Sequence, residues 1–149
     1  MLGKFYKFHV KNNLSFDMDL SSNSANEIIN LSWTPWKIKT FGAIVYGTEI
    51  TKAYTAADIA DDASFEFSQT DNSTDLNIGA LGMLTYETDD ASALGNIALY
   101  YEISTDGGTT YPSDAADFIA SEDLLLVIRL QIAGDGAGYK RSTPFQMSA

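Results

Sequence analysis

The sequence contains no cysteine, which excludes a disulfide-stapled scaffold, a thiol nucleophile and a cysteine-ligated metal site. It also lacks any run of about 18 apolar residues, the length that a membrane-spanning helix needs. Lys4, Lys7 and Lys11 interrupt the first stretch of the chain, so no secretory signal is predicted there. The composition is instead that of a folded protein, with 45% hydrophobic and 12% aromatic residues.

Basic residues are scarce and unevenly placed. The chain has 9 basic and 20 acidic residues, a net charge of −11, and no basic residue between Lys52 and Arg129. Nucleic acids and anionic membranes attract clustered Lys and Arg, so neither is expected as a partner. Residues 1–52 hold six lysines against four acids, whereas residues 53–149 hold three basic residues against sixteen acids. The acidic part could therefore meet a basic partner, or the N-terminal third of another copy.

Catalytic signatures are also missing. The sequence has no nucleophile elbow, phosphate-binding loop, dinucleotide-binding glycine motif or zinc-protease motif. His9 is the only histidine, and the lysines beside it predict a surface position. We interpret the strand-borne acids as solvated surface rather than as a glycosidase pair, the alternative for Glu66, Glu87 and Glu102. No catalytic residue and no cofactor are expected.

The sequence does contain many short segments of alternating apolar and polar residues, typical of β-strands. The strongest pattern, Leu124–Ile132, predicts a central strand, with one buried face made of Leu126, Ile128, Leu130 and Ile132. About ten strands are expected, with short helices over residues 56–62 and 114–120. These elements predict an all-β fold in a single domain, residues 1–149. A two-sheet antiparallel sandwich, immunoglobulin-like or jelly-roll, is the first choice and a closed barrel the second.

Turn signals place the predicted breaks between strands. Asn12-Asn13 predicts a turn between strands 6–11 and 14–20. Thr34-Pro35 predicts a break, and Pro144 predicts an edge or a bend in the last strand. Asp106-Gly107 predicts a tight hairpin whose second strand is Thr109–Tyr111.

Several side chains are candidates for binding. Loop acids could bind calcium, although a plain polar loop is the competing interpretation for Asp71, Asp75, Asp89 and Asp90. Residues 1–13 are predicted to form a strand or arm that could pair with another chain. Its interface candidates, with one aromatic from a later strand, are Lys4, Phe5, Tyr6, Lys7, Phe8, Lys11 and Tyr100. Trp33 and Trp36 are interpreted as core residues, with sugar stacking as the alternative.

One stretch resembles a known family. Residues Asn96–Pro112, NIALYYEISTDGGTTYP, end an alternating strand in a DGG turn followed by an aromatic residue. This segment, with an irregular excursion over Ser113–Asp123, the hydrophobic strand Leu124–Ile132 and a final strand over Tyr139–Phe145, is similar to small β-sandwich virion proteins of tailed bacteriophages. The motif also occurs in bacterial sugar-binding and adhesion modules.

The resemblance implies a non-enzymatic structural component of a virion that is assembled in the host cytoplasm. A capsid decoration or cement protein is the first expectation, with the major capsid protein or copies of itself as partners. A tail or neck protein is the second, and a carbohydrate-binding or host-adhesion module is the alternative. In each case the protein would act through contacts with other molecules, without a metal or cofactor.

Overall fold

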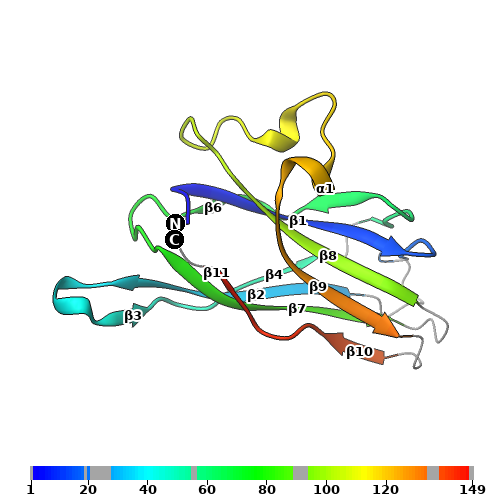
Figure 1. The fold of residues 1–149 in the computed structure, drawn as a ribbon, viewed down its shortest axis with the longest axis horizontal. Helices are drawn as coiled ribbons and strands as arrows, with labels where there is room; N and C mark the ends of the chain where they lie inside the picture. Colours follow the sequence, from blue (N-terminus) through cyan, green and yellow to red (C-terminus); the bar gives the residue numbers. More distant parts are fainter. Residues whose placement is uncertain are drawn as a thin grey trace.

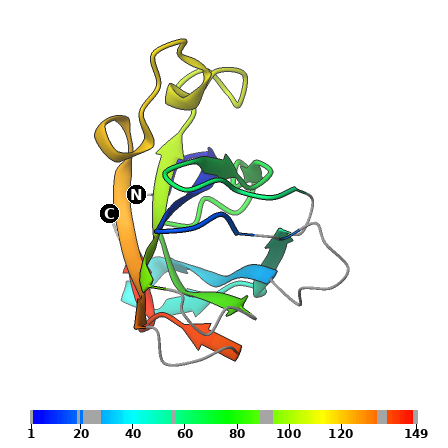
Figure 2. The ribbon, with the colours of Figure 1, turned by 90° about the vertical axis from the view of Figure 1, so that its right-hand side faces the viewer.

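The computed structural model describes residues 2–18, 20, 28–54, 57–88, 94–133 and 138–147. Within these residues the chain forms two antiparallel β-sheets that pack face to face, with a few very short helices (Figures 1 and 2). The prediction of a two-sheet antiparallel sandwich is therefore confirmed. In the described part of the chain, none of the helices is long and apolar enough to cross a membrane.

The two sheets draw their strands from alternating parts of the chain. The five-stranded sheet contains β1 (Phe5–Leu14), β5 (Ser64–Glu66), β6 (Thr70–Asp71), β8 (Leu94–Ile103) and β9 (Leu125–Ala133). The six-stranded sheet contains β2 (Ile28–Ile38), β3 (Ile44–Tyr46), β4 (Ile50–Tyr54), β7 (Gly79–Thr88), β10 (Gly138–Arg141) and β11 (Phe145–Met147). The short helical elements are η1 (Thr40–Gly42), η2 (Pro112–Asp114) and α1 (Ala120–Asp123).

Aromatic side chains fill the centre of the sandwich. The ring of Phe8 lies 5.0 Å from that of Trp33 and 5.6 Å from that of Tyr101. Trp33 Nε1 donates a hydrogen bond of 3.0 Å to the Tyr6 hydroxyl, so burying this indole leaves no polar atom unpaired. Trp33 is thus a core residue, as the sequence predicted.

β1 lies in the interior of its sheet rather than at an edge. It pairs with β8 along one side and with β5 and β6 along the other. The predicted turn at Asn12-Asn13 is wrong because both asparagines belong to this strand. Asn12 is buried, and its Nδ2 donates to the carbonyls of Phe16 and Ile59 at 2.9 and 3.1 Å. These bonds satisfy the side-chain amide of Asn12 inside the fold, so the residue can remain in the strand.

The predicted break at Thr34-Pro35 is also wrong, since β2 continues through it. On one side β2 pairs with β7 without interruption. On the other side it pairs first with β4, as far as Trp33, and then with β3, from Trp36 onward. Pro35 lies where β2 changes from one partner to the other, and its carbonyl still accepts the N–H of Gly47 at 2.7 Å. Its lack of an N–H is therefore tolerated at a point where the ladder already changes partner. By contrast, the bend predicted at Pro144 is confirmed, because it separates β10 from β11.

β9 is the strand predicted to be central, but it pairs only with β8 among the described residues and lies at the edge of its sheet. It runs along one side of the sandwich and approaches β10 and β11 of the other sheet (Figure 2). Its pairing shifts by one residue, since Leu99 faces Ile128 while Tyr100 faces Leu126. Such a bulge reverses the alternation, so Val127 joins the inner core and Leu126 packs on the outer face.

The chain between β8 and β9, Ser104–Leu124, is named here the covering segment. It rises beyond the end of β8 and carries η2 and α1 (Figure 1). The expected hairpin with a second strand at Thr109–Tyr111 is wrong. Instead, Asp106 Oδ1 accepts the N–H groups of Thr109 and Thr110 at 3.1 and 2.8 Å, which closes a loop. Gly107 and Gly108 have φ of 82° and 93°, which glycine adopts without strain.

Helical structure is shorter than expected and lies elsewhere. The helix predicted over residues 114–120 is replaced by η2 and α1 at the two ends of that stretch. Within the predicted helix over 56–62, the described residues 57–62 are not helical. Ile59 instead forms an isolated bridge with Met18, and both side chains are buried in the core. Burial of Ile59 against Met18 therefore outweighs the local helix propensity of this stretch.

Candidate functional site

A histidine and two glutamates meet on the outer face of the five-stranded sheet. β1 carries His9, and its backbone is paired with Glu66 of β5 on one side and with Tyr100 of β8 on the other. Two residues further along β8, Glu102 occupies the same outer face. His9 and Glu102 each retain only 3% exposure, whereas the Glu66 side chain is 48% exposed.

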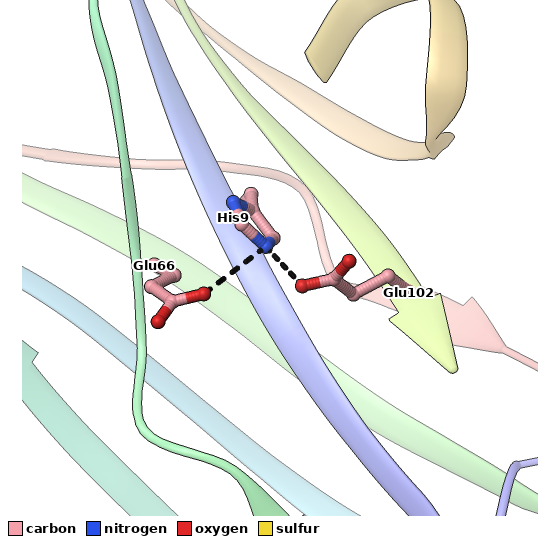
Figure 3. A group of neighbouring side chains, drawn as sticks. All are labelled: His9, Glu66 and Glu102. Carbon is pink, nitrogen blue, oxygen red and sulfur yellow. Dashed lines mark hydrogen bonds and ion pairs between the residues drawn. The ribbon is translucent and has the colours of Figure 1, made fainter. Parts of the chain in front are cut away.

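Both carboxylates approach the same ring nitrogen (Figure 3). Glu102 Oε1 lies within hydrogen-bond distance of His9 Nε2, while Glu66 Oε2 lies 3.7 Å from it. The second distance is too long for a hydrogen bond, so the N–H of His9 serves Glu102 alone. Lys7 Nζ approaches Glu66 Oε2 at 2.8 Å and stacks 4.3 Å from the centre of the Tyr111 ring.

The covering segment holds the other side of Glu102. The N–H of Ser113 donates to Glu102 Oε2 at 3.0 Å, and its hydroxyl donates to Oε1 at 2.8 Å. Burial alone would raise the pKa of Glu102, but the hydrogen bonds from His9 and Ser113 outweigh it and hold that pKa below its ordinary value. Glu102 is therefore the charged centre that ties β8 to both β1 and the covering segment.

Apolar side chains of the covering segment close over this site. The Phe118 ring lies 5.5 Å from the His9 imidazole. Ala120 packs with Tyr100 and Ala98, and together they form a second, smaller cluster on the outer face of β8. Beside it is a hollow of about 300 Å³ lined by Lys11, Asp62, Ser64, Phe118, Ile119 and Ala120.

The structure thus corrects two expectations about charged residues. His9 and Glu102 were predicted at the surface, because each falls on the polar side of an alternating strand. Both are buried, since the covering segment turns that polar side into a second interior. No local sequence pattern indicated this, because the residues that cover Glu102 begin about ten positions further along an irregular stretch.

The interface predicted around β1 also needs correction. Tyr6 and Phe8 are core residues with 1% exposure, and Tyr100 lies beneath the covering segment. None of the three can offer a contact surface without opening the fold. Lys7 and Lys11 pair with Glu66 and Asp62 of their own chain. Phe5 is half-buried and Lys4 is exposed, so these two keep accessible surface.

Of the four calcium candidates, the structure describes Asp71 and Asp75. Asp71 Oδ1 accepts the N–H of Ser73 at 2.7 Å. Hydrogen bonds from the side chain and the backbone of Ser73 hold the pKa of Asp71 below its ordinary value. Asp75 Oδ1 lies 3.5 Å from Lys37 Nζ. Asp89 and Asp90 fall outside the described residues. Calcium binding at these acids stays a prediction.

A second notable region is the hairpin formed by the end of β2, η1 and β3, residues 38–46, named here the apolar hairpin. It extends from one end of the six-stranded sheet (Figure 1, cyan). Its large apolar side chains are strongly exposed: Ile38 53%, Phe41 102%, Ile44 55% and Tyr46 55%. Phe41 also has a positive φ of 72°, which is unfavourable for a residue with a bulky side chain.

The sequence analysis did not predict this exposed hairpin. The sequence predicts one longer strand over residues 36–46 with a bulge at Gly42, whereas the structure divides this stretch into the end of β2, η1 and β3. The available signal was Phe41-Gly42, an aromatic beside a glycine within a supposed strand. It was interpreted as a bulge.

Comparison with known proteins adds no assignment: no protein-family model, curated protein or solved structure matches this chain.

Proposed function

We propose that this chain is a non-enzymatic structural protein of a tailed-bacteriophage particle, and that it works by docking the apolar hairpin into another protein. A capsid decoration or cement protein is the leading role, with a tail or neck component as the second. The observation that carries the proposal is the exposure of four large apolar side chains on one protruding hairpin. Stable monomers rarely leave such a patch in water.

The energetics favour a partner for this hairpin. Full burial of one large apolar side chain contributes about 1.5–3 kcal/mol, so the four together could supply much of a stable contact. Phe41 contributes nothing to the fold by packing, because its side chain is fully exposed. An exposed aromatic held on a strained tip is the kind of residue that anchors an interface.

The charges beside the tip indicate the chemistry of the partner. Lys39 lies within the hairpin and Lys37 lies just before it on β2, where it also contacts Asp75. Most charged residues after the hairpin are acidic. A fitting partner surface is an apolar pocket with acidic residues at its rim. Opposite charges at a rim orient two surfaces and speed their association.

The phage context is supported by the resemblance of Asn96–Pro112 and the segments after it to small β-sandwich virion proteins. The sandwich fold agrees with that resemblance, although it hosts many other functions. In the particle, the protein would contact the major capsid protein or other copies of itself.

The alternative of a carbohydrate-binding module loses most of its proposed contacts. Sugar stacking needs an exposed aromatic face, yet Trp33 and Tyr100 are buried. Trp36 is only half-buried and is the one remaining candidate of the three.

A binding experiment with matched variants tests the proposal. Native mass spectrometry would be run on the chain alone and with candidate major capsid proteins of tailed phages. The wild type should form a defined complex with one of them. The double variant Phe41→Ser, Ile44→Ser should weaken that complex by at least about a hundredfold, because two anchors are lost.

The control is Leu94→Ser, which removes a similarly exposed leucine from the other sheet (54%). It should bind as the wild type does. A wild-type chain that stays monomeric with every partner, or a hairpin variant that binds as well as the control, would overturn the proposal. Self-association that depends on the hairpin would instead identify a second copy as the occupant.

A further inference from the structure

Three side chains of metal-binding type converge on the outer face of the five-stranded sheet. His9 Nε2 and one carboxylate oxygen each from Glu66 and Glu102 all lie within 4.8 Å of one another. They come from three adjacent strands, β5, β1 and β8, which fixes their relative positions. We propose that His9, Glu66 and Glu102 together bind one divalent transition-metal ion, with zinc as the best match.

The donor set selects the class of metal. Imidazole nitrogen with carboxylate oxygens suits zinc and its neighbours, at bond lengths of about 2.0–2.2 Å. Calcium is a poor match because it prefers six to eight oxygen ligands. Two ligands of a tetrahedral zinc ion lie roughly 3.4 Å apart at those bond lengths. Glu66 Oε2 and His9 Nε2 are separated by 3.7 Å, close to that spacing.

The arrangement is poorly explained as a hydrogen-bonded ion pair alone. The proton on His9 Nε2 can join only Glu102, and the oxygen of Glu66 faces the same nitrogen from too far away to share it. A metal ion in place of that proton contacts the nitrogen and both carboxylates at once. Binding it requires the Glu102 carboxylate to move slightly away from the ring.

The surroundings supply the support that metal ligands usually have. Ser113 donates two hydrogen bonds to Glu102, which hold this carboxylate in place. Phe118 forms an apolar wall beside the imidazole. Glu66 is the exposed ligand and gives the ion a route from solvent. Lys7 is its competitor, since its ammonium lies on the same Glu66 oxygen that faces His9.

Zinc titration of the full chain tests this directly. Calorimetry and native mass spectrometry with zinc chloride should show one ion per chain, and zinc should raise the melting temperature. Glu66→Gln should weaken binding by about tenfold or more. This variant should fold, because Glu66 is half-exposed. The matched control is Asp62→Asn, which removes an exposed carboxylate paired with Lys11 nearby and should leave zinc binding unchanged.

Lys7→Met separates a metal site from a purely structural cluster. Removing the competing ammonium should strengthen zinc binding by several-fold, although it removes an ion pair from the metal-free protein. The ring signals of His9, the only histidine, report the site by NMR and should shift with zinc. No zinc binding, equal binding by Glu66→Gln, or zinc binding that leaves the His9 signals in place would each overturn the proposal.

Discussion

In most proteins charged groups lie at the surface and apolar groups lie inside. Two regions of this chain depart from that pattern in opposite ways: the outer face of the five-stranded sheet and the apolar hairpin of the six-stranded sheet. At the first, the chain buries charged and polar groups, with His9 and Glu102 both below 5% exposure. At the second, it leaves large apolar groups in water, with Phe41 fully exposed. The first region is closed by the chain's own covering segment, whereas no described residue covers the second.

This difference shows which region is complete within one chain. Buried charge is expensive unless it is paired, and the chain supplies the pairing through Ser113 and His9. Exposed apolar surface is also unfavourable, yet no residue in the described part of the chain covers Phe41. The chain itself thus supplies protein contacts for its buried polar groups, and the apolar exposure is the feature for which we propose a protein partner.

The largest effect is expected from breaking the buried site. Glu102→Ala removes the acceptor for the N–H of Ser113, for its hydroxyl and for His9, and leaves the buried His9 and the half-buried Ser113 without this partner. Because three hydrogen bonds to a charged acceptor are lost together, each contributing about 1.5–3 kcal/mol, the free energy of unfolding should fall by about 3–5 kcal/mol after partial relaxation. Urea unfolding of the metal-free protein measures this.

The control is Glu87→Ala, which removes a strand-borne glutamate on the other sheet. It should change stability by less than about 1 kcal/mol. Equal losses for the two variants would mean that the covering segment does not create a special environment at Glu102.

Alkaline pH probes the opposite face of β8, where Tyr101 lies in the inner core. Burial raises the pKa of Tyr101 to about 12, although a hydrogen bond from the N–H of Gly3 opposes this. The unfolded chain ionises this hydroxyl near pH 10, so stability is fully present below pH 10 and is lost as pH rises toward 12. The expected loss is about 2–3 kcal/mol.

Urea unfolding at several pH values between 9 and 12 measures this loss. Tyr101→Phe should flatten most of the pH dependence, and Tyr6, whose pKa burial also raises, should account for the remainder. A wild-type stability that is unchanged over this range would show that the inner face of β8 admits water.

The sequence predicted the fold class because alternation is a local signal. Each strand shows this alternation independently of the others. Sheets with one apolar face bury it most simply by packing against each other as a sandwich. The sequence could not reveal that Pro35 falls between two partners of β2, because strand pairing joins distant residues. The same limit explains β9, whose neighbours are set by topology rather than by its hydrophobicity.

The candidate site was missed for a related reason. His9 and Glu102 each fall on the polar side of an alternating strand, which predicts exposure to solvent. They are buried only because the covering segment packs over them. The apolar hairpin was missed in the reverse way, because an apolar stretch does not indicate that its side chains lie in solvent. In both regions the pattern indicated which face a side chain occupies, but not what covers that face.

A milder change tests how the covering segment is held. Ser113→Ala removes one of the two hydrogen bonds that Ser113 donates to Glu102 and leaves the backbone N–H as donor. Since hydrogen bonds to charged groups contribute about 1.5–3 kcal/mol, stability should fall by about 1.5 kcal/mol. Hydrogen exchange should accelerate in the covering segment but not in the apolar hairpin. Faster exchange in both would indicate that the two regions are coupled.

The smallest effect should have the opposite sign. Phe41→Gly replaces a bulky residue at positive φ with the one residue that adopts this conformation without strain. Because the Phe41 side chain packs on nothing in the chain, the variant should gain about 1 kcal/mol in unfolding free energy while losing affinity for a partner. Thermal unfolding and native mass spectrometry on the same sample measure both quantities. A residue that lowers the stability of its own fold and raises the affinity of a complex is retained for the complex. A loss of stability in Phe41→Gly would instead show that Phe41 supports the fold itself, and the contrast between the two regions would disappear.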